Sequence, residues 1–390
     1  MAFLAIAFLS LTIWIFLLLF WGQFWRADRK LERQEKKLES YPSVYAIIPA
    51  RNEADLLPTA LRSLLTQDYP GIFSIVLIDD RSTDGTAKVT REIAEQLEQT
   101  EKLTVISGEP LPTGWTGKLW AIEQGIRYAS QQTPDYFLLT DADIEHGNKN
   151  LCRLVAKAER DNLDLVSLMV LLRCQNFWEK LLIPAFVFFF QKLYPFPWVN
   201  NPYKKTAAAA GGCILLRRQA LERIGGIGVV RQALIDDCAL ARAIKSSEYK
   251  DNQSNPIWLG LTESTRSLRP YDSLQTIWDM VTRTAYSQLN YSPWLLMGTV
   301  LAMSLVYLAA PLSLLAGIIM ANGLLTSIGL LTWLLMSLAY LPTVRLYQMS
   351  PLWAVCLPAI AFLYTLMTID SALKYWQGKG GAWKGRVYSQ

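Results

Sequence analysis

The chain alternates between long uncharged apolar runs and a central stretch with the shorter periodicities of a folded domain. Its first charged residue is Arg26, and no charged residue lies between Arg283 and Arg345. About 20 apolar residues are enough to cross the hydrocarbon core of a bilayer. We therefore predict a transmembrane anchor at 1–25 and transmembrane segments over 293–370.

In the central stretch, 41–275, short apolar runs alternate with segments of helical periodicity. Short apolar runs between polar segments are typical of buried strands, and strands that alternate with helices indicate right-handed βαβ units. We predict an α/β domain with a mostly parallel sheet. Its strands are expected at 44–48, 75–79, 103–106 and 136–140, and its helices near 53–66, 85–98, 118–130 and 148–160.

One apolar and aromatic segment, 181–198, interrupts this alternation. A full crossing here would place the two halves of the domain on opposite sides of the membrane. The run is also short for a span and is broken by Pro184, Lys192 and Pro195. We therefore predict an interfacial or re-entrant segment. A second membrane-interface segment is expected at 276–292, before the C-terminal spans.

The charges that flank the apolar runs predict the orientation. Residues 26–40 form a basic linker with six Lys or Arg, so the domain that follows is expected in the cytoplasm of a multi-pass protein of the cell inner membrane. The tail, 371–390, is also basic. Three crossings, at 294–319, 323–343 and within 346–369, would leave that tail outside. A re-entrant segment among them is the alternative.

Composition excludes several classes of protein. With 52% hydrophobic and 18% charged residues, the chain is not typical of a soluble protein. A net charge of +5 does not support nucleic-acid binding, but it suits an anionic membrane surface. The five cysteines are scattered without a C-x-x-C pair, which argues against a disulfide scaffold and a cysteine zinc site. Because His146 is the only histidine, sites that need two histidines are excluded.

Charged residues follow the first two predicted strands. The segment IIPARNE places Pro49, Arg51 and Glu53 after the first, and LIDDRSTDGT places Asp79 and Asp80 after the second. Open α/β sheets bind ligands beyond the carboxyl ends of their strands. Carboxylates there can accept hydrogen bonds from a base and from ribose hydroxyls. Ordinary polar turns with helix-capping residues are the alternative.

A third strand ends in LLTDADI, with Asp141 and Asp143 separated by one residue. Alternate residues of an extended chain point the same way, so these two carboxylates need a cation. Mg²⁺ or Mn²⁺ suits them, because a bound diphosphate can complete the shell of oxygen ligands. The alternative is an acidic surface turn. We interpret His146 as a turn or surface residue rather than a ligand.

Two later segments add a base and a cation. Asp236 and Asp237 open a helical pattern in RQALIDDCALARAIK, where a carboxylate can remove a proton from a hydroxyl. A plain helix cap is the alternative. Lys118, at a helix start in LPTGWTGKLWA, is placed to contact a diphosphate, unless that segment is only a surface turn. The small residues 207–212 permit close approach of a substrate or of backbone.

These motifs, in this order, resemble the family 2 glycosyltransferases, which have a GT-A fold. The resemblance covers about 42–270 and implies a nucleotide-diphosphate sugar as donor, most often a uridine diphosphate sugar. It implies that Asp141 and Asp143 form the DxD motif that binds a divalent metal, and that Asp237 is the general base beside Asp236. The residues that it assigns to the nucleoside pocket are Pro49, Arg51, Glu53, Asp79 and Asp80.

The Q-x-x-R-W motif of processive members is absent. The segments GWTGK, GGCILLRR, RTAYSQL and AWKGRVY resemble the hopene-associated glycosyltransferases, and carotenoid-acid and ceramide enzymes look similar. This resemblance implies an inverting membrane enzyme that glycosylates a lipid acceptor, with Arg283 at the diphosphate or at the membrane interface. The alternatives are a polysaccharide or polyprenyl-phosphate glycosyltransferase, and a non-catalytic membrane protein that binds nucleotide sugars or lipids.

Overall fold

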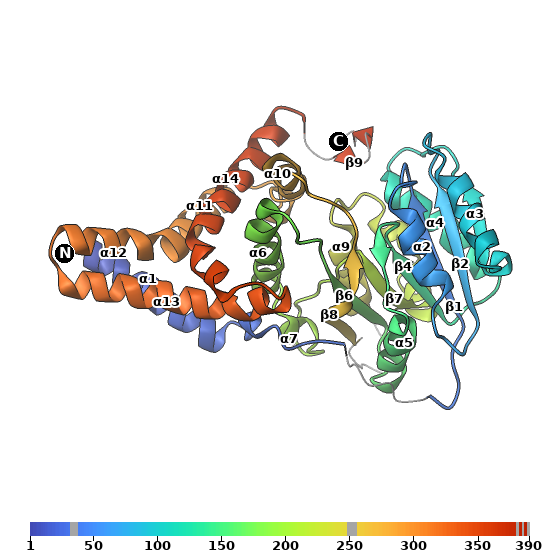
Figure 1. Cartoon of the computed structure of the whole chain (residues 1–390), viewed down its shortest axis with the longest axis horizontal. Helices are drawn as coiled ribbons and strands as arrows, with labels where there is room; N and C mark the ends of the chain where they lie inside the picture. The colour runs from blue at the N-terminus through green and yellow to red at the C-terminus, as the bar shows by residue number, and fades with distance from the viewer. Residues whose placement is uncertain (32–37, 248–255, 380–381, 384–385, 388–390) are drawn as a thin grey trace. The chain divides into compact units, whose positions relative to one another are not determined.

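The computed structural model describes the chain except for residues 32–37, 248–255, 380–381, 384–385 and 388–390. The chain divides into two compact units. The unit that contains the sheet comprises 28–173, 198–270 and 383–390, and the unit of apolar helices comprises 1–27, 174–197 and 271–382 (Figure 1). Parts of the predicted linker and of the predicted basic tail lie outside the described residues.

The main sheet has eight strands in the order β3-β2-β1-β4-β7-β6-β8-β5. The half made of β3, β2, β1 and β4 is parallel, whereas β7 runs antiparallel to both of its neighbours. This confirms the predicted α/β fold with a mostly parallel sheet. The strands are β1 (Val44–Ala50), β2 (Phe73–Asp79), β3 (Leu103–Ser107), β4 (Tyr136–Thr140), β5 (Ile144–Glu145), β6 (Leu165–Leu171), β7 (Cys213–Arg217) and β8 (Ile257–Ser267).

The helices of this unit cover the sheet and begin close to their predicted positions. The first starts four residues later than predicted, because Glu53 accepts the backbone bonds of a preceding turn through its carbonyl oxygen. The helices are α2 (Leu57–Leu65), α3 (Thr86–Gln96), α4 (Gly117–Ser130), α5 (Asn150–Arg160), α8 (Arg218–Arg223) and α9 (Asp236–Ser246).

Alternation along β1 explains why both faces of the sheet are covered. Val44, Ala46 and Ile48 belong to one buried cluster, together with apolar residues of α2, α3 and α5. The residues between them face the other way, and Ile47 lies directly against α4. A Cβ atom added at Gly125 of α4 would lie 2.6 Å from Ile47 Cγ2, so glycine permits this close packing. Burial on both faces explains the continuous apolar character of the central strands.

The second unit consists of helices. The segment predicted as interfacial or re-entrant forms most of α6 and most of α7, and its position at a membrane stays a prediction. The helices are α1 (Ala2–Phe20), α6 (Phe177–Leu193), α7 (Phe196–Val199), α10 (Leu274–Thr282), α11 (Pro293–Met303), α12 (Ala309–Ile319), α13 (Gly323–Leu346) and α14 (Leu357–Trp376). Two short strands, β9 (Ala382–Trp383) and β10 (Arg386–Val387), pair near the C-terminus.

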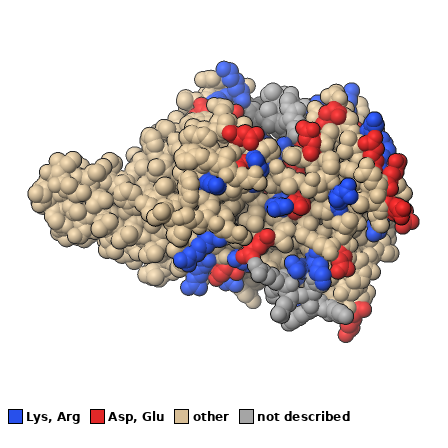
Figure 2. Space-filling view, in the orientation of Figure 1, with Lys and Arg blue, Asp and Glu red and all other residues tan. Residues whose placement is uncertain are grey.

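Among the residues that the structure describes, four helical segments, all in this unit, are long and apolar enough to cross a membrane: Ala2–Phe20, Pro293–Ile319, Gly323–Leu346 and Pro351–Trp376. Their outer surfaces are rich in exposed apolar side chains, of which Ile319 is 83% and Leu312 is 62% exposed. Figure 2 shows no Lys, Arg, Asp or Glu on the visible face of the left-hand end of the view, where α12 and the N-terminal end of α13 lie. Such a surface suits lipid rather than water.

Candidate active site

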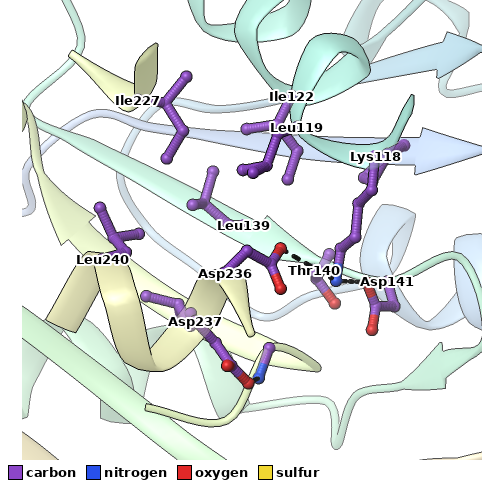
Figure 3. Close-up of a pocket in the computed structure, with 13 residues that line it drawn as sticks. Lys118, Leu119, Ile122, Leu139, Thr140, Asp141, Ile227, Asp236, Asp237 and Leu240 are labelled. Carbon is purple, nitrogen blue, oxygen red and sulfur yellow. Dashed lines mark hydrogen bonds and ion pairs between the residues drawn. The ribbon is translucent and has the colours of Figure 1, made fainter. Parts of the chain in front are cut away.

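A pocket opens at the carboxyl ends of β1 and β4, where the N-terminal turns of α4 and α9 also meet (Figure 3). Its polar side chains include one lysine and three aspartates, and the rest of its wall is mostly apolar. The residues that line it are Pro49, Lys118, Leu119, Ile122, Leu139, Thr140, Asp141, Gly211, Ile214, Ile227, Asp236, Asp237 and Leu240. The structure therefore brings together five residues that the sequence singled out: Pro49, Lys118, Asp141, Asp236 and Asp237.

Asp237 lies in the first turn of α9, and its carboxylate accepts two backbone hydrogen bonds. Oδ2 accepts from the N–H of Gly211 at 2.8 Å, and Oδ1 accepts from the N–H of Cys238 at 2.7 Å. Burial and the neighbouring carboxylate of Asp236 raise the pKa of Asp237 to about 6, although Lys118 and the two N–H groups oppose the shift. A carboxylate with this pKa is largely ionised at neutral pH and is a stronger base than an ordinary aspartate.

Lys118 extends from the first turn of α4 between two of the acids. Its Nζ lies 2.7 Å from Asp141 Oδ1 and 3.8 Å from Asp236 Oδ2. The side chain of Thr116 caps the helix by accepting a bond from the N–H of Leu119. Burial alone lowers the pKa of Lys118, but the surrounding carboxylates outweigh burial and raise it. The lysine is therefore charged at neutral pH.

The two acids of the D-x-D segment have different partners. Asp141 faces the pocket and pairs with Lys118, whereas Asp143 is buried, accepts a 2.7 Å bond from Ser267 Oγ and lies 3.4 Å from Arg269 Nε. β4 ends at Thr140, and the chain then turns at 142–143. The extended geometry assumed from the sequence is therefore wrong here, and each acid has its own cation. The metal site at Asp141 and Asp143 stays a prediction.

The side chain of Arg269 also contacts Glu53, which follows the first predicted strand. Its Nη2 lies 2.7 Å from Glu53 Oε1, so one guanidinium joins the carboxylates of Glu53 and Asp143. Sequence reasoning missed this residue, and also Ser267, because both lie more than 120 positions after Asp143. The only sequence signal was the position of these two polar residues at the end of an apolar strand pattern.

The other predicted nucleoside residues meet at the adjacent edge of the sheet. Ala50 and Asp79 are register partners on β1 and β2. Arg51 Nη1 donates to the carbonyl oxygen of Asp80 at 2.8 Å and lies 3.5 Å from its carboxylate. Asp79 Oδ1 accepts a bond from the N–H of Ser82, which shapes the following turn. Glu53 and Asp80 are both buried.

Two further residues lie away from the pocket lining. Arg283 follows the last turn of α10, in the unit of helices, and its role stays a prediction. His146 belongs to the sheet unit, and its interpretation as a surface residue is wrong because its side chain is only 4% exposed. Both of its ring nitrogens have partners, Thr140 Oγ1 at 2.9 Å and Asn150 Nδ2 at 3.0 Å. Burial lowers its pKa to about 3, so the ring is neutral.

Part of the chain that carries these motifs is similar to known proteins. Residues 45–225 match the family described as Glycosyl transferase family 2. A 4,4'-diaponeurosporenoate glycosyltransferase of Staphylococcus haemolyticus is 30% identical over 32% of this chain and 30% of its own length. A beta-monoglucosyldiacylglycerol synthase of Trichormus variabilis is 27% identical over 38% and 30%, respectively. An undecaprenyl-phosphate 4-deoxy-4-formamido-L-arabinose transferase of Enterobacter sp. is 33% identical over 32% and 36%.

The chain thus spans only about a third of the length of these relatives. Among solved structures, the mannosyltransferase PcManGT of Pyrobaculum calidifontis, determined with GDP-Man and Mn²⁺, matches over 96% of this chain and 99% of its own, at a TM-score of 0.52 and 20% identity. This likeness extends over both units and confirms the predicted GT-A fold. The relatives' names include lipid and polyprenyl-phosphate acceptors. The family match at 45–225 covers less than half of the 390 residues of this chain.

Proposed function

We propose that this protein transfers a sugar from a nucleotide-diphosphate sugar to a hydroxyl group of a lipid acceptor, with inversion at the anomeric carbon. The observation that carries the proposal is the position of Asp237, a carboxylate of raised pKa in the same pocket as Lys118 and Asp141. One wall of the pocket thus offers a base, and the other offers a cation for a diphosphate. These are the two functions that a displacement at a sugar carbon requires.

In the proposed reaction, the Asp237 carboxylate takes the proton of the acceptor hydroxyl. The acceptor oxygen forms a bond to the anomeric carbon while the bond from that carbon to the diphosphate oxygen breaks. The nucleoside diphosphate leaves with the bonding electron pair, and one displacement inverts the carbon. Lys118 stabilises the charge on the departing diphosphate through its ammonium group. Asp236 keeps Asp237 basic through like-charge repulsion.

The edge formed by β1 and β2 is proposed to hold the donor nucleoside, with uridine favoured. Asp79, Asp80 and Glu53 offer acceptors for base N–H and ribose hydroxyl groups, and Arg51 holds Asp80 in place. Pro49 forms the wall between this edge and the acid pocket. Arg283 is proposed to contact the diphosphate.

A divalent metal fits part of this pocket. Asp141 lines the pocket, its side chain is 34% exposed, and it offers hard oxygen ligands of the kind that Mg²⁺ and Mn²⁺ prefer together with diphosphate oxygens and water. Asp143 joins this set only by exchanging its contact with Arg269. Among the described residues, no three His, Cys, Asp or Glu side chains are placed to hold a metal by themselves. When bound, such a metal neutralises charge on the diphosphate.

The acceptor is proposed to be a membrane lipid, with a hopanoid type favoured. The support is the set of four helical segments long enough to cross a bilayer and the lipid acceptors in the names of two relatives. We propose that the protein is a multi-pass protein of the cell inner membrane with its catalytic domain in the cytoplasm. A polyprenyl phosphate is the second candidate acceptor, because the undecaprenyl-phosphate transferase is 33% identical in the matched region.

The test uses membranes that contain the full chain, radiolabelled nucleotide sugars, Mg²⁺ or Mn²⁺, and separate additions of hopanoid and polyprenyl phosphate. We expect label in an organic-soluble product with the hopanoid, and its loss in Asp237→Asn. A matched control is Asp68→Asn, because that side chain is 59% exposed and forms only a surface ion pair with Lys149. The control is expected to transfer label like the unchanged protein.

Each other outcome has a defined meaning. Label that enters only polyprenyl phosphate would replace the hopanoid with the second acceptor. Label that enters only a water-soluble polymer would support a polysaccharide product. If Asp237→Asn bound the donor and transferred sugar at the normal rate, the assignment of the base would be wrong. Donor binding without transfer to any acceptor would support the non-catalytic alternative.

A further inference from the structure

We propose that Lys118 is a built-in cation that occupies Asp141 while the donor is absent, so that a divalent metal reaches this carboxylate only together with the donor diphosphate. The inference rests on the proposed function, since it concerns how the same pocket receives its donor. It goes further by assigning Lys118 a second task besides contact with the diphosphate. That task is to prevent the acid cluster from binding a free metal ion.

The first support is the strength and position of the Lys118–Asp141 contact. Nζ lies 2.7 Å from Asp141 Oδ1, and the two side chains are 20% and 34% exposed. An ion pair at this distance and burial is screened much less by solvent than a surface pair. It also covers the pocket carboxylate that is best exposed to an incoming metal, because Asp143 is buried against Arg269 and Ser267.

The second support is that the local structure would otherwise disfavour a cation at this place. Lys118 lies in the first turn of α4, where the partial positive charge of the helix repels cations. Burial disfavours its charged form as well. Only the carboxylates of Asp141, Asp236 and Asp237 favour the ammonium group there. Lys118 is therefore held by the acid cluster, and a ligand that changes the charge of the cluster can release it.

The third support is the charge balance of the cluster. Three ionised carboxylates carry −3 and Lys118 contributes +1, so a charge of −2 remains within the pocket lining. That charge would attract a divalent ion, but the ammonium group repels it from Asp141. A diphosphate brings new negative charge for Lys118 to contact. Its flexible four-carbon stem allows the transfer, whereas a metal alone offers the lysine no new partner.

Gly211 shows how closely the cation and the base are packed. A Cβ atom added at this glycine would lie 3.4 Å from both Lys118 Nζ and Asp237 Oδ2. The lysine therefore lies beside the base as well as beside Asp141. When Lys118 leaves Asp141 upon donor binding, it would clear the space between Asp141 and Asp237. The carboxylate for the metal and the base would then become available for reaction at the same time.

The experiment measures binding of Mn²⁺ alone to the purified full-length protein, from the free-ion signal in electron paramagnetic resonance, with no nucleotide or sugar present. Lys118→Met removes the ammonium group and keeps an unbranched side chain, and Lys118→Arg keeps the positive charge. We expect Lys118→Met to bind Mn²⁺ at least about tenfold more tightly than the unchanged protein, since it removes a like charge beside the ligand. Lys118→Arg should bind as weakly as the unchanged protein.

A double variant, Lys118→Met with Asp141→Asn, locates the gained site. Loss of the tenfold gain in the double variant supports the proposal. Persistence of the gain would overturn it, because the ion would then bind elsewhere. Equal or weaker binding by Lys118→Met, in protein whose thermal unfolding shows it to be folded, would also overturn it. The readout requires no sugar transfer, so it stands or fails separately from the proposed reaction.

Discussion

The N–H of Gly211 donates a 2.8 Å hydrogen bond to Oδ2 of Asp237. This bond joins the small-residue segment before β7 to the first turn of α9, two parts of the chain that are 26 positions apart. The bond uses one lone pair of the Asp237 carboxylate, so the orientation of this base depends on the position of the Gly211 backbone. The chemistry of the pocket therefore depends on how precisely this segment is held.

Replacement of Gly211 by alanine tests this dependence. The added Cβ would lie 3.4 Å from both Asp237 Oδ2 and Lys118 Nζ, at the limit of van der Waals contact, so the methyl group would crowd both groups. We expect kcat to fall by about 10- to 100-fold with little change in thermal stability, because small displacements of catalytic groups strongly affect rate. Gly298→Ala, where nothing lies within 4 Å, is the matched control in initial-rate assays.

The pH dependence of sugar transfer follows from the raised pKa of Asp237. A general base acts only when it is ionised, so kcat/KM should fall about tenfold per pH unit below about 6 and level off above it. An ordinary aspartate would keep activity down to about pH 4. Initial rates between pH 4.5 and 8, in protein shown to stay folded, distinguish the two. A flat profile down to pH 4.5 would contradict this role.

The raised pKa of Asp237 also predicts that its ionised carboxylate lowers the stability of the folded protein. Because burial and Asp236 raise the folded pKa of Asp237, the folded state holds more protons than the unfolded state between about pH 4 and 6. Stability is therefore lost as pH rises through this window, and the loss is complete above it. We expect Asp237→Asn to raise the melting temperature at pH 7.5, with a smaller gain at pH 4.5. Asp68→Asn should show no such difference.

Replacement of Arg269 tests how much its contacts with Asp143 and Glu53 stabilise the folded protein. Both carboxylates are buried, so Arg269→Gln leaves two charges without their shared guanidinium. We expect a loss of about 2 kcal/mol in the free energy of unfolding, less than for a fully buried pair because Arg269 is 32% exposed. Arg266→Gln breaks an ion pair between β8 and Glu145 of the neighbouring strand β5, but Arg266 is 64% exposed. This control should lose less than about 1 kcal/mol in chemical denaturation.

The sequence was sufficient for the features that depend on local pattern. The strands that end near Pro49, Asp79 and Asp141 were predicted because buried parallel strands are continuous apolar runs. Asp237 and Lys118 line the same pocket as Asp141, and their roles there stay predictions. Local pattern could not show that the chain turns after Asp141. Because of this turn, the side chains of Asp141 and Asp143 do not point the same way.

Contacts between distant segments were not predictable in the same way. Arg269 reaches Asp143 and Glu53 only because β8 and β5 are paired at the edge of the sheet. His146 was expected at a surface, but β5 and α5 bury it, and two polar neighbours satisfy its ring. In both cases the sequence shows a polar residue in a plausible turn. Only the tertiary fold shows which partner it meets.

Lys245 provides a final test of how α9 holds the segment that ends at Gly211. Its Nζ donates to the carbonyl oxygens of Val199 at 2.6 Å and Thr206 at 2.7 Å, two turns along the helix from Asp237. Nearer the base, Cys238 Sγ donates to the carbonyl oxygen of Ala209. The helix that carries the base thus contacts this segment at several places along its length.

Lys245→Met removes the ammonium group and leaves these carbonyl oxygens without that donor. We expect a loss of about 2 kcal/mol in unfolding free energy, because buried acceptors that lose a partner are costly. The larger effect should be on kcat, since a loosened segment no longer holds the N–H of Gly211 against Asp237. Lys88→Met, at a site 80% exposed, is the control for loss of a lysine. If kcat stayed unchanged in folded Lys245→Met, the segment would be held by its contacts near the base alone, and Lys245 would serve stability only.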